Sequence, residues 1–245
     1  SITTDAISLS GALSGTSTLT IAPKTSTTTI GLGTTATGVL HFTDTELSKL
    51  SAGFSSITFG SSASTGKITA AEYTYLDNIK LLNYGTSSNG IEFIGAVSVG
   101  SKNLTLYTTG SVTQSAAITA AGLELLGTGG NYTLTNTGNA ITTLAGNTGT
   151  VSFTENSGFA IGAVNTVGLT TSGNTTLTVN GTVTQSNLLN VLGLELLGSN
   201  GTYTLTNTSN AITTLAGNTK IVSLVENSGF DIGTVNTVGL TTSGN

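Results

Sequence analysis

The hydrophobic residues of this chain recur at every second position over short stretches. Leu123-Glu-Leu125, Tyr132-Thr-Leu134 and Val151-Ser-Phe153 alternate apolar and polar residues. That period places the apolar side chains on one face of a β-strand. Glycine and asparagine separate the strands, for example at Gly138-Asn139 and Asn156-Ser-Gly158, and both residue types accept turn conformations. The pattern predicts an all-β protein built from many short strands.

An internal repeat decides between the possible all-β architectures. Asn103–Gly173 aligns with Asn174–Gly244 without a gap, and 50 of the 71 positions are identical. Asn245 would begin a third copy. A strict period indicates units that stack in fixed register, as in a solenoid. Division of the repeat by three gives turns of about 24 residues, and the whole chain would form about ten turns of a parallel β-solenoid.

The repeat also divides the chain into three segments. Residues 103–173 and 174–245 are the two solenoid repeats, and residues 1–102 are expected to form less regular turns with larger corners. We interpret the three segments as one continuous solenoid, taken from a longer chain with more of the same chain stacked at both ends. Thr43/Glu46 and Thr69/Glu72 each have the spacing of a capping box, which predicts short helices at corners within residues 42–50 and 68–76.

Charge is scarce, and this excludes several classes of protein. Only 7% of the residues are charged, there is no Arg or Cys, and the net charge is −5. Nucleic-acid binding needs a basic face, which six scattered lysines cannot supply. Ser, Thr, Asn and Gly together make up 134 of the 245 residues. Uncharged polar residues can stack on their own kind from turn to turn without repulsion.

Two asparagines are candidates for hydrogen bonds between turns. Asn136 and Asn207 fall on the same parity as the buried positions of their strands. We interpret them as inward-pointing corner residues whose amides bond to the next turn. The alternative is that both are ordinary exposed turn residues.

Several segments resemble a known family. Leu19-Thr-Ile-Ala-Pro23, Leu40-His-Phe-Thr-Asp-Thr-Glu-Leu-Ser-Lys-Leu50 and Gly110-Ser-Val-Thr-Gln-Ser115 are similar, in their order, to modules of filamentous-haemagglutinin-type exoproteins. The resemblance implies a right-handed parallel β-helix within a very large bacterial surface protein. It also implies export by two-partner secretion through an outer-membrane partner barrel, and adhesion as the usual role. This chain would be an internal shaft segment, so the barrel would not be recognised through it.

Candidates for catalysis are few. His41 is the only histidine and lies in a strand-like segment, so we interpret it as a surface or strand residue. Glu124 and Glu195 are equivalent in the two repeats, as are Glu155 and Glu226, and we expect each pair to lie in line three turns apart. Repetition explains these carboxylates better than catalysis does. We therefore predict no catalytic residue, no cofactor and no metal site. The lysines, which we expect to be dispersed, are Lys24, Lys49, Lys67, Lys80, Lys102 and Lys220.

Two kinds of binding site stay open at this stage. The tripeptide Asn-x-Ser/Thr could accept glycans, although several copies are expected by chance in so Asn- and Thr-rich a chain. Ladders such as Thr133/Thr135/Thr137 could order water at an ice surface, but the ladder would have to recur on each turn. The possible glycan acceptors are Asn103, Asn131, Asn174, Asn180, Asn200 and Asn207.

The sequence as a whole favours a structural and adhesive shaft on the outside of a bacterial cell. Host surfaces, glycans or neighbouring fibres are its possible partners, and nucleic acid is not. The alternatives are a polysaccharide-active parallel β-helix enzyme and a self-assembling surface filament. Low charge and stackable strand edges also permit lateral association between copies.

Overall fold

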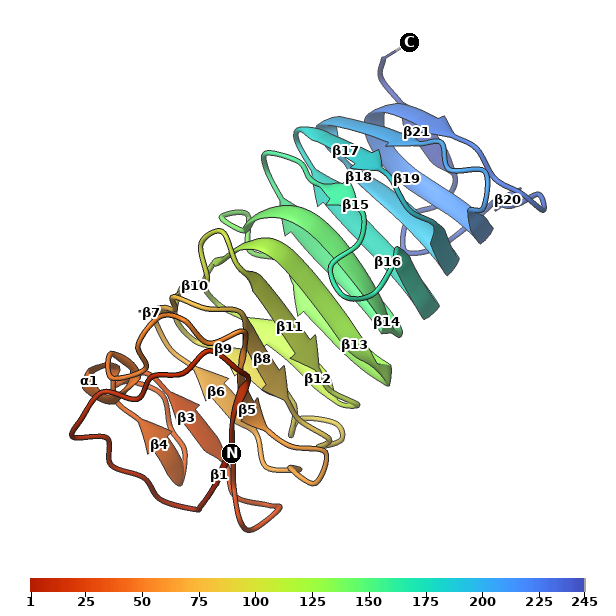
Figure 1. Ribbon diagram of the computed structural model, residues 1–245. Helices are drawn as coiled ribbons and strands as arrows, with labels where there is room; N and C mark the ends of the chain where they lie inside the picture. Colours follow the sequence, from red (N-terminus) through yellow and green to blue (C-terminus); the bar gives the residue numbers. More distant parts are fainter. Residues whose placement is uncertain (245) are drawn as a thin grey trace. The chain divides into compact units, whose positions relative to one another are not determined.

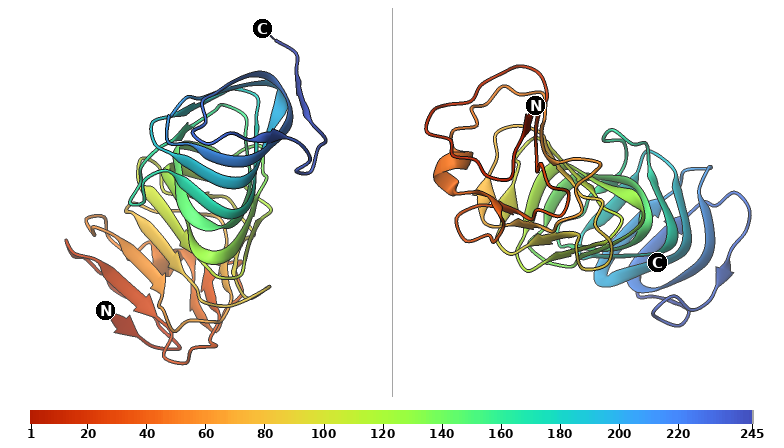
Figure 2. Two further views of the ribbon diagram at one scale, coloured as in Figure 1. Left: turned by 90° about the vertical axis from the view of Figure 1, so that its right-hand side faces the viewer. Right: turned by 90° about the horizontal axis from the view of Figure 1, so that it is seen from below.

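The computed structural model describes residues 1–244, so the predicted start of a third repeat at Asn245 lies outside the described residues. The chain is an almost entirely β protein, a parallel β-solenoid of about 11 turns, which confirms the predicted fold class. It forms two compact units, Ser1–Ala121 and Gly122–Asn245. Figures 1 and 2 show short strands stacked turn upon turn within each unit.

The strands of the first unit are short. They are β1 (Ile2–Thr3), β2 (Leu19–Ala22), β3 (Ile30–Leu32), β4 (Leu40–Phe42), β5 (Ile57–Gly60), β6 (Ile68–Ala70), β7 (Tyr73–Thr74), β8 (Ile79–Leu82), β9 (Ile91–Phe93), β10 (Val97–Ser98), β11 (Asn103–Tyr107) and β12 (Ser111–Gln114). Strand β13 (Ile118–Leu134) begins in the first unit and continues into the second. Strand β2 ends directly before Pro23, which cannot donate to the ladder.

The strands of the second unit are longer, and several bend around a corner. They are β14 (Ala140–Glu155), β15 (Ala160–Ile161), β16 (Leu169–Val179), β17 (Thr182–Gln185), β18 (Leu189–Leu205), β19 (Ala211–Leu224), β20 (Asp231–Ile232) and β21 (Leu240–Thr242).

Parallel pairing stacks like residues into columns, and these columns form the core. In the first unit Ile21 pairs with Phe59, Phe59 with Leu81, and Leu81 with Leu106. All four side chains are buried. The alternation in the sequence thus becomes one inward row per strand, and the burial of these rows supplies most of the stabilisation.

The corner helix predicted within residues 42–50 is present and the one within 68–76 is not. Helix α1 (Asp44–Leu47) begins at Thr43, whose hydroxyl accepts from the Glu46 amide while the Glu46 carboxylate accepts from the Thr43 amide. Thr69, in contrast, lies within β6, which pairs on both sides with neighbouring turns. Because strand pairing already uses its backbone and buries its neighbours, Thr69 cannot act as a helix cap.

The turns of the second unit are shorter than the sequence suggested. One column runs from Phe153 through Leu177, Leu196 and Gly217 to Leu240, so four turns carry the chain from position 153 to position 240. The mean turn is therefore about 22 residues. A repeat of 71 residues spans about three and a third such turns, so the prediction of three longer turns per repeat is wrong.

A repeat exceeds three turns by about one third of a turn, so equivalent residues lie on different sides of the solenoid. We call the column through Phe153, Leu177, Leu196 and Gly217 side A. Gly146, the equivalent of Gly217, instead pairs with Leu169 and through it with Leu189. This column, which we call side B, precedes side A along strand β14 by about one third of a turn.

Candidate functional site

Two loops of the second unit leave their side of the solenoid and fold back over it. We call residues 162–168 and 233–239 the straps. Strap 162–168 separates β15 from β16 on side B, and strap 233–239 separates β20 from β21 on side A. Each closes through one antiparallel bridge, Ala163 with Val167 and Thr234 with Val238. Both contain the same word, Val-Asn-Thr-Val-Gly.

The strap on side B binds the carboxylate of Glu124. The backbone amides of Asn165 and Thr166 donate to Glu124 Oε1 at 3.2 and 2.6 Å, and Asn165 Nδ2 donates to Oε2 at 2.9 Å. Glu124 is 1% exposed. A buried carboxylate is stable only when hydrogen-bond donors replace its hydration, and the strap provides them.

The strap on side A repeats the arrangement around Glu195. Asn236 Nδ2 and the amide of Thr237 donate at 2.7 Å each, and Thr176 Oγ1 donates at 2.8 Å. Burial alone raises the pKa of Glu195, but the donors from Asn236, Thr176 and Thr237 outweigh that effect and hold the pKa below its ordinary value. The carboxylate is therefore ionised at neutral pH.

A small residue lets each strap reach beyond its neighbouring turn. On side A, Ala216 pairs with Glu195 from the next turn and is fully buried. The strap belongs to the turn after that, because β20 and β21 pair with the turn that contains Ala216. Each strap thus connects a turn to its second neighbour, whereas an ordinary solenoid turn contacts only its first.

Glu124 and Glu195 do not come into line. Gly146 lies over the Leu125 carbonyl, so Glu124 belongs to side B, while Glu195 pairs with Thr176 and Ala216 on side A. The expectation that these carboxylates lie in line three turns apart is wrong, because the repeat contains about one third of a turn more than three.

The inward asparagines are three residues later than expected. Asn136 and Asn207 accept from the amides of Gly138 and Ser209 and form local turns. Asn139 and Asn210 are the buried ones. Asn210 Nδ2 donates to the carbonyls of Leu205 and Val225, and its Oδ1 accepts from the Leu189 amide. The amide bonds between turns predicted for this corner exist, but a different residue makes them.

The second pair of repeated glutamates lies at corners, and the same offset of about one third of a turn keeps these two out of line. Glu155 is 1% exposed and accepts from the Ile141 amide at 3.0 Å and from Ser157 Oγ at 2.6 Å. Burial raises the pKa of Glu155 above its ordinary value, and the hydrogen bonds offset only part of this rise. Glu226 is more exposed, and donors from Ser228, Gly229 and Ile212 lower its pKa against the opposing effect of burial.

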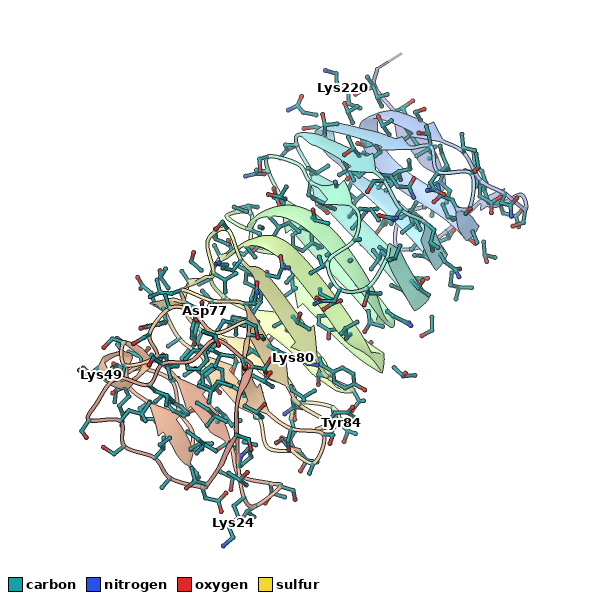
Figure 3. The ribbon with its side chains drawn as sticks, viewed as in Figure 1. Lys24, Lys49, Asp77, Lys80, Tyr84 and Lys220 are labelled. Atoms are coloured by element: carbon teal, nitrogen blue, oxygen red, sulfur yellow. The ribbon has the colours of Figure 1, made fainter. Side chains whose placement is uncertain are left out.

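The structure also places the remaining candidate residues. His41 is half-buried, with Nε2 3.0 Å from the carbonyl of Gly33, and no carboxylate bonds to its ring in the described structure. In the first unit Lys24, Lys49 and Lys80 lie apart from one another (Figure 3). Four of the possible glycan acceptors are exposed, Asn131, Asn174, Asn180 and Asn200, and two are half-buried, Asn103 and Asn207.

Three cavities bear on the search for a site. One of about 480 Å³ includes Leu192, Phe230 and Asp231 in the second unit. The other two are in the first unit: one of about 360 Å³ has Asp44 and Glu72 on its wall, and one of about 230 Å³ has Lys67 and Tyr84. None of the three combines several carboxylates with a lysine. Among residues 1–244 no cluster of three or more metal-ligating side chains occurs.

Comparison with known proteins gives one family match. Residues 78–148 match a family described as repeats of unknown function (DUF5649). The matched segment has the same length as the internal repeat and covers less than a third of the chain. No curated protein and no solved structure matches the chain significantly. In the part of the chain that the structure describes, no helix is long and apolar enough to span a membrane. The chain is a repeat protein with the fold of a parallel β-solenoid.

Proposed function

We propose that this chain is a structural and adhesive shaft segment of a large secreted bacterial surface fibre. The repeat β-solenoid fold is compatible with a structural role. The resemblance to filamentous-haemagglutinin-type exoproteins supports the adhesive part of the proposal and the export by two-partner secretion.

The straps are the observation that carries the proposal. A rod of stacked turns fails when one turn separates from the next, and backbone pairing alone resists this only between immediate neighbours. Glu124 and Glu195 each bind a strap that belongs to the second turn after their own. Separation of neighbouring turns between a glutamate and its strap therefore also breaks charge-assisted hydrogen bonds. Such hydrogen bonds between second-neighbour turns favour a molecule that must stay extended.

We also propose that the segment has no catalytic activity. A polysaccharide-active solenoid enzyme would need carboxylates and a base along one groove. The cavity with Asp44 and Glu72 has no lysine on its wall, and the cavity with Lys67 has no carboxylate on its wall. Release of reducing ends or unsaturated products from pectate, alginate or hyaluronate by the purified chain would overturn this part.

Surface location is the direct test of the shaft. An antibody raised against the purified segment should label intact cells of the source organism and should label them no more strongly after permeabilisation. A pre-immune serum and an antibody to a cytosolic protein are the controls. Labelling that requires permeabilisation would overturn the proposal.

A further inference from the structure

The cavity of about 230 Å³ in the first unit lies where three turns meet at a corner. Thr27 and Thr29 contribute from one turn, Thr65 and Gly66 from the next, and the segment from Tyr84 to Asn89 from the third. Its wall is made of threonine side chains, one asparagine, one lysine, glycine backbone and one aromatic ring. Pockets for drug-sized ligands span about 300–1,000 Å³, so this one has room for a single small ring.

Tyr84 reaches this cavity as the end of a two-ring stack. Its ring lies 4.6 Å from that of Tyr107, with 28° between the planes. A hydrogen bond between the two hydroxyls raises the pKa of Tyr107, with burial adding to the rise. The ring of Tyr84, at the corner after β8 (Figure 3), is therefore held in place before any ligand arrives.

The one charged residue on the cavity wall is already paired. Lys67 Nζ lies 2.5 Å from Glu92 Oε2, and both side chains are about one third exposed. The pair cancels the local charge, so the cavity does not select for an anion or a cation. What the wall offers instead is an aromatic face beside uncharged hydrogen-bonding groups.

We propose that this cavity binds a neutral sugar ring. A pyranose has an apolar face of C–H groups that packs on an aromatic ring and a rim of hydroxyls that bond to threonine and asparagine side chains. In the bound state the sugar lies against Tyr84, with its hydroxyls toward Thr65, Thr27 and Asn89. The inference does not depend on the proposed shaft role, because a sugar site could serve a protein in any location.

Saturation-transfer NMR on the full chain tests the site. The probes are the methyl glycosides of glucose, galactose, mannose and N-acetylglucosamine, with methyl glucuronide as the anionic comparison. At least one neutral glycoside should receive saturation. Tyr84→Ala should weaken its binding at least about tenfold, whereas Tyr84→Phe, which keeps the ring, should stay within about threefold of the unchanged chain.

Two further variants keep the test decisive. Asn89→Ala changes an exposed side chain and leaves the ring stack intact, so it should weaken binding even if Tyr84→Ala disturbs folding. Thr133→Ala, exposed in the second unit, should leave binding unchanged. The proposal fails if no neutral glycoside receives saturation, if only the glucuronide does, or if both cavity variants bind as well as the unchanged chain.

Discussion

The backbone amide of Thr237 donates to Glu195 Oε1 at 2.7 Å, although 42 residues separate the two in the chain. This contact, with its counterpart between Thr166 and Glu124 at 2.6 Å, ties each turn to the second turn along. It gives the solenoid a side-chain network in addition to the strand pairing of its backbone.

Removal of the buried charge should destabilise the second unit. Glu195→Gln keeps the shape of the side chain but weakens the hydrogen bonds from Asn236, Thr176 and Thr237. Buried polar groups that lose their partners cost about 1–3 kcal/mol. We expect a loss of that size in the free energy of unfolding, measured with urea by circular dichroism. Glu72→Gln, at an exposed glutamate, is the control and should change stability by less than about 0.5 kcal/mol. Equal effects of the two substitutions would contradict the role of the strap.

Loss of both strap anchors should also reduce cooperativity. Because the straps couple second neighbours, Glu124→Gln/Glu195→Gln leaves a stack held mainly by nearest-neighbour pairing. The urea transition of the second unit should become broader, with a lower m-value, as turns unfold more independently. A transition that shifts to lower urea without broadening would show that the straps add stability but not coupling.

Glu195 and Glu155, one from each repeated pair, should respond to pH in opposite directions. The folded-state pKa of Glu195 lies below the usual 4.5, so its contribution to stability is present above that value and is lost as the pH falls through the folded pKa. The folded-state pKa of Glu155 lies above 4.5, so its contribution is present below that value and is lost as the pH rises through the folded pKa.

Urea unfolding between pH 3.5 and 7 measures this difference. The stability cost of Glu195→Gln should shrink as the pH falls, because the unchanged glutamate then becomes protonated as well. The cost of Glu155→Gln should shrink as the pH rises, because the charge that it removes is unfavourable when buried. Parallel trends for the two variants would refute the opposite pKa shifts.

The buried asparagine should matter more than its predicted neighbour. Asn210→Ala removes bonds to the carbonyls of Leu205 and Val225 and leaves buried polar groups without partners, which should cost about 2–4 kcal/mol. Asn207→Ala, in the local turn of the same corner, should cost about 0.5–1 kcal/mol. Thermal unfolding of both variants ranks them, and the reverse order would overturn the assignment of the inter-turn bonds.

Spin labels can test the offset of about one third of a turn between the repeats. Val167 and Val238 are equivalent strap residues that are 57% and 85% exposed, and each can be replaced by a labelled cysteine. If the repeat were three turns, the labels would lie on one side about 14 Å apart and broaden each other's spectra. With three and a third turns they lie on different sides, about 20 Å apart or more, and the spectrum should be close to the sum of the single labels.

Local rules predicted the parts of the fold that depend on neighbouring residues. The alternation in Tyr132-Thr-Leu134 gave the correct buried face, and the capping box at Thr43 gave the correct helix. The same signature at Thr69 failed because pairing with two other turns took precedence. Asn136 was chosen by strand parity, but the chain bends at this corner, so parity did not extend to Asn139.

The straps needed information that a repeat count does not contain. The word Val-Asn-Thr-Val-Gly was visible in both repeats, but its partner lies 41 residues earlier in the chain. Only the true length of a turn brings Asn165 onto Glu124, and the longer turn expected from the sequence would have missed this contact and its counterpart. A signal was present, since Leu123-Glu-Leu125 and Leu144-Ala-Gly146 lie one true turn apart and both words recur at the same spacing in the second repeat.

The third of a turn left over in each repeat gives repeat number a period of three. Loss or gain of one copy, the event expected from recombination between such similar stretches, turns every later residue to another side of the solenoid. Loss or gain of three copies restores the original side. Where one side must meet a partner, variants of such a protein should therefore differ by multiples of three repeats, and where orientation is unimportant other differences should be equally common.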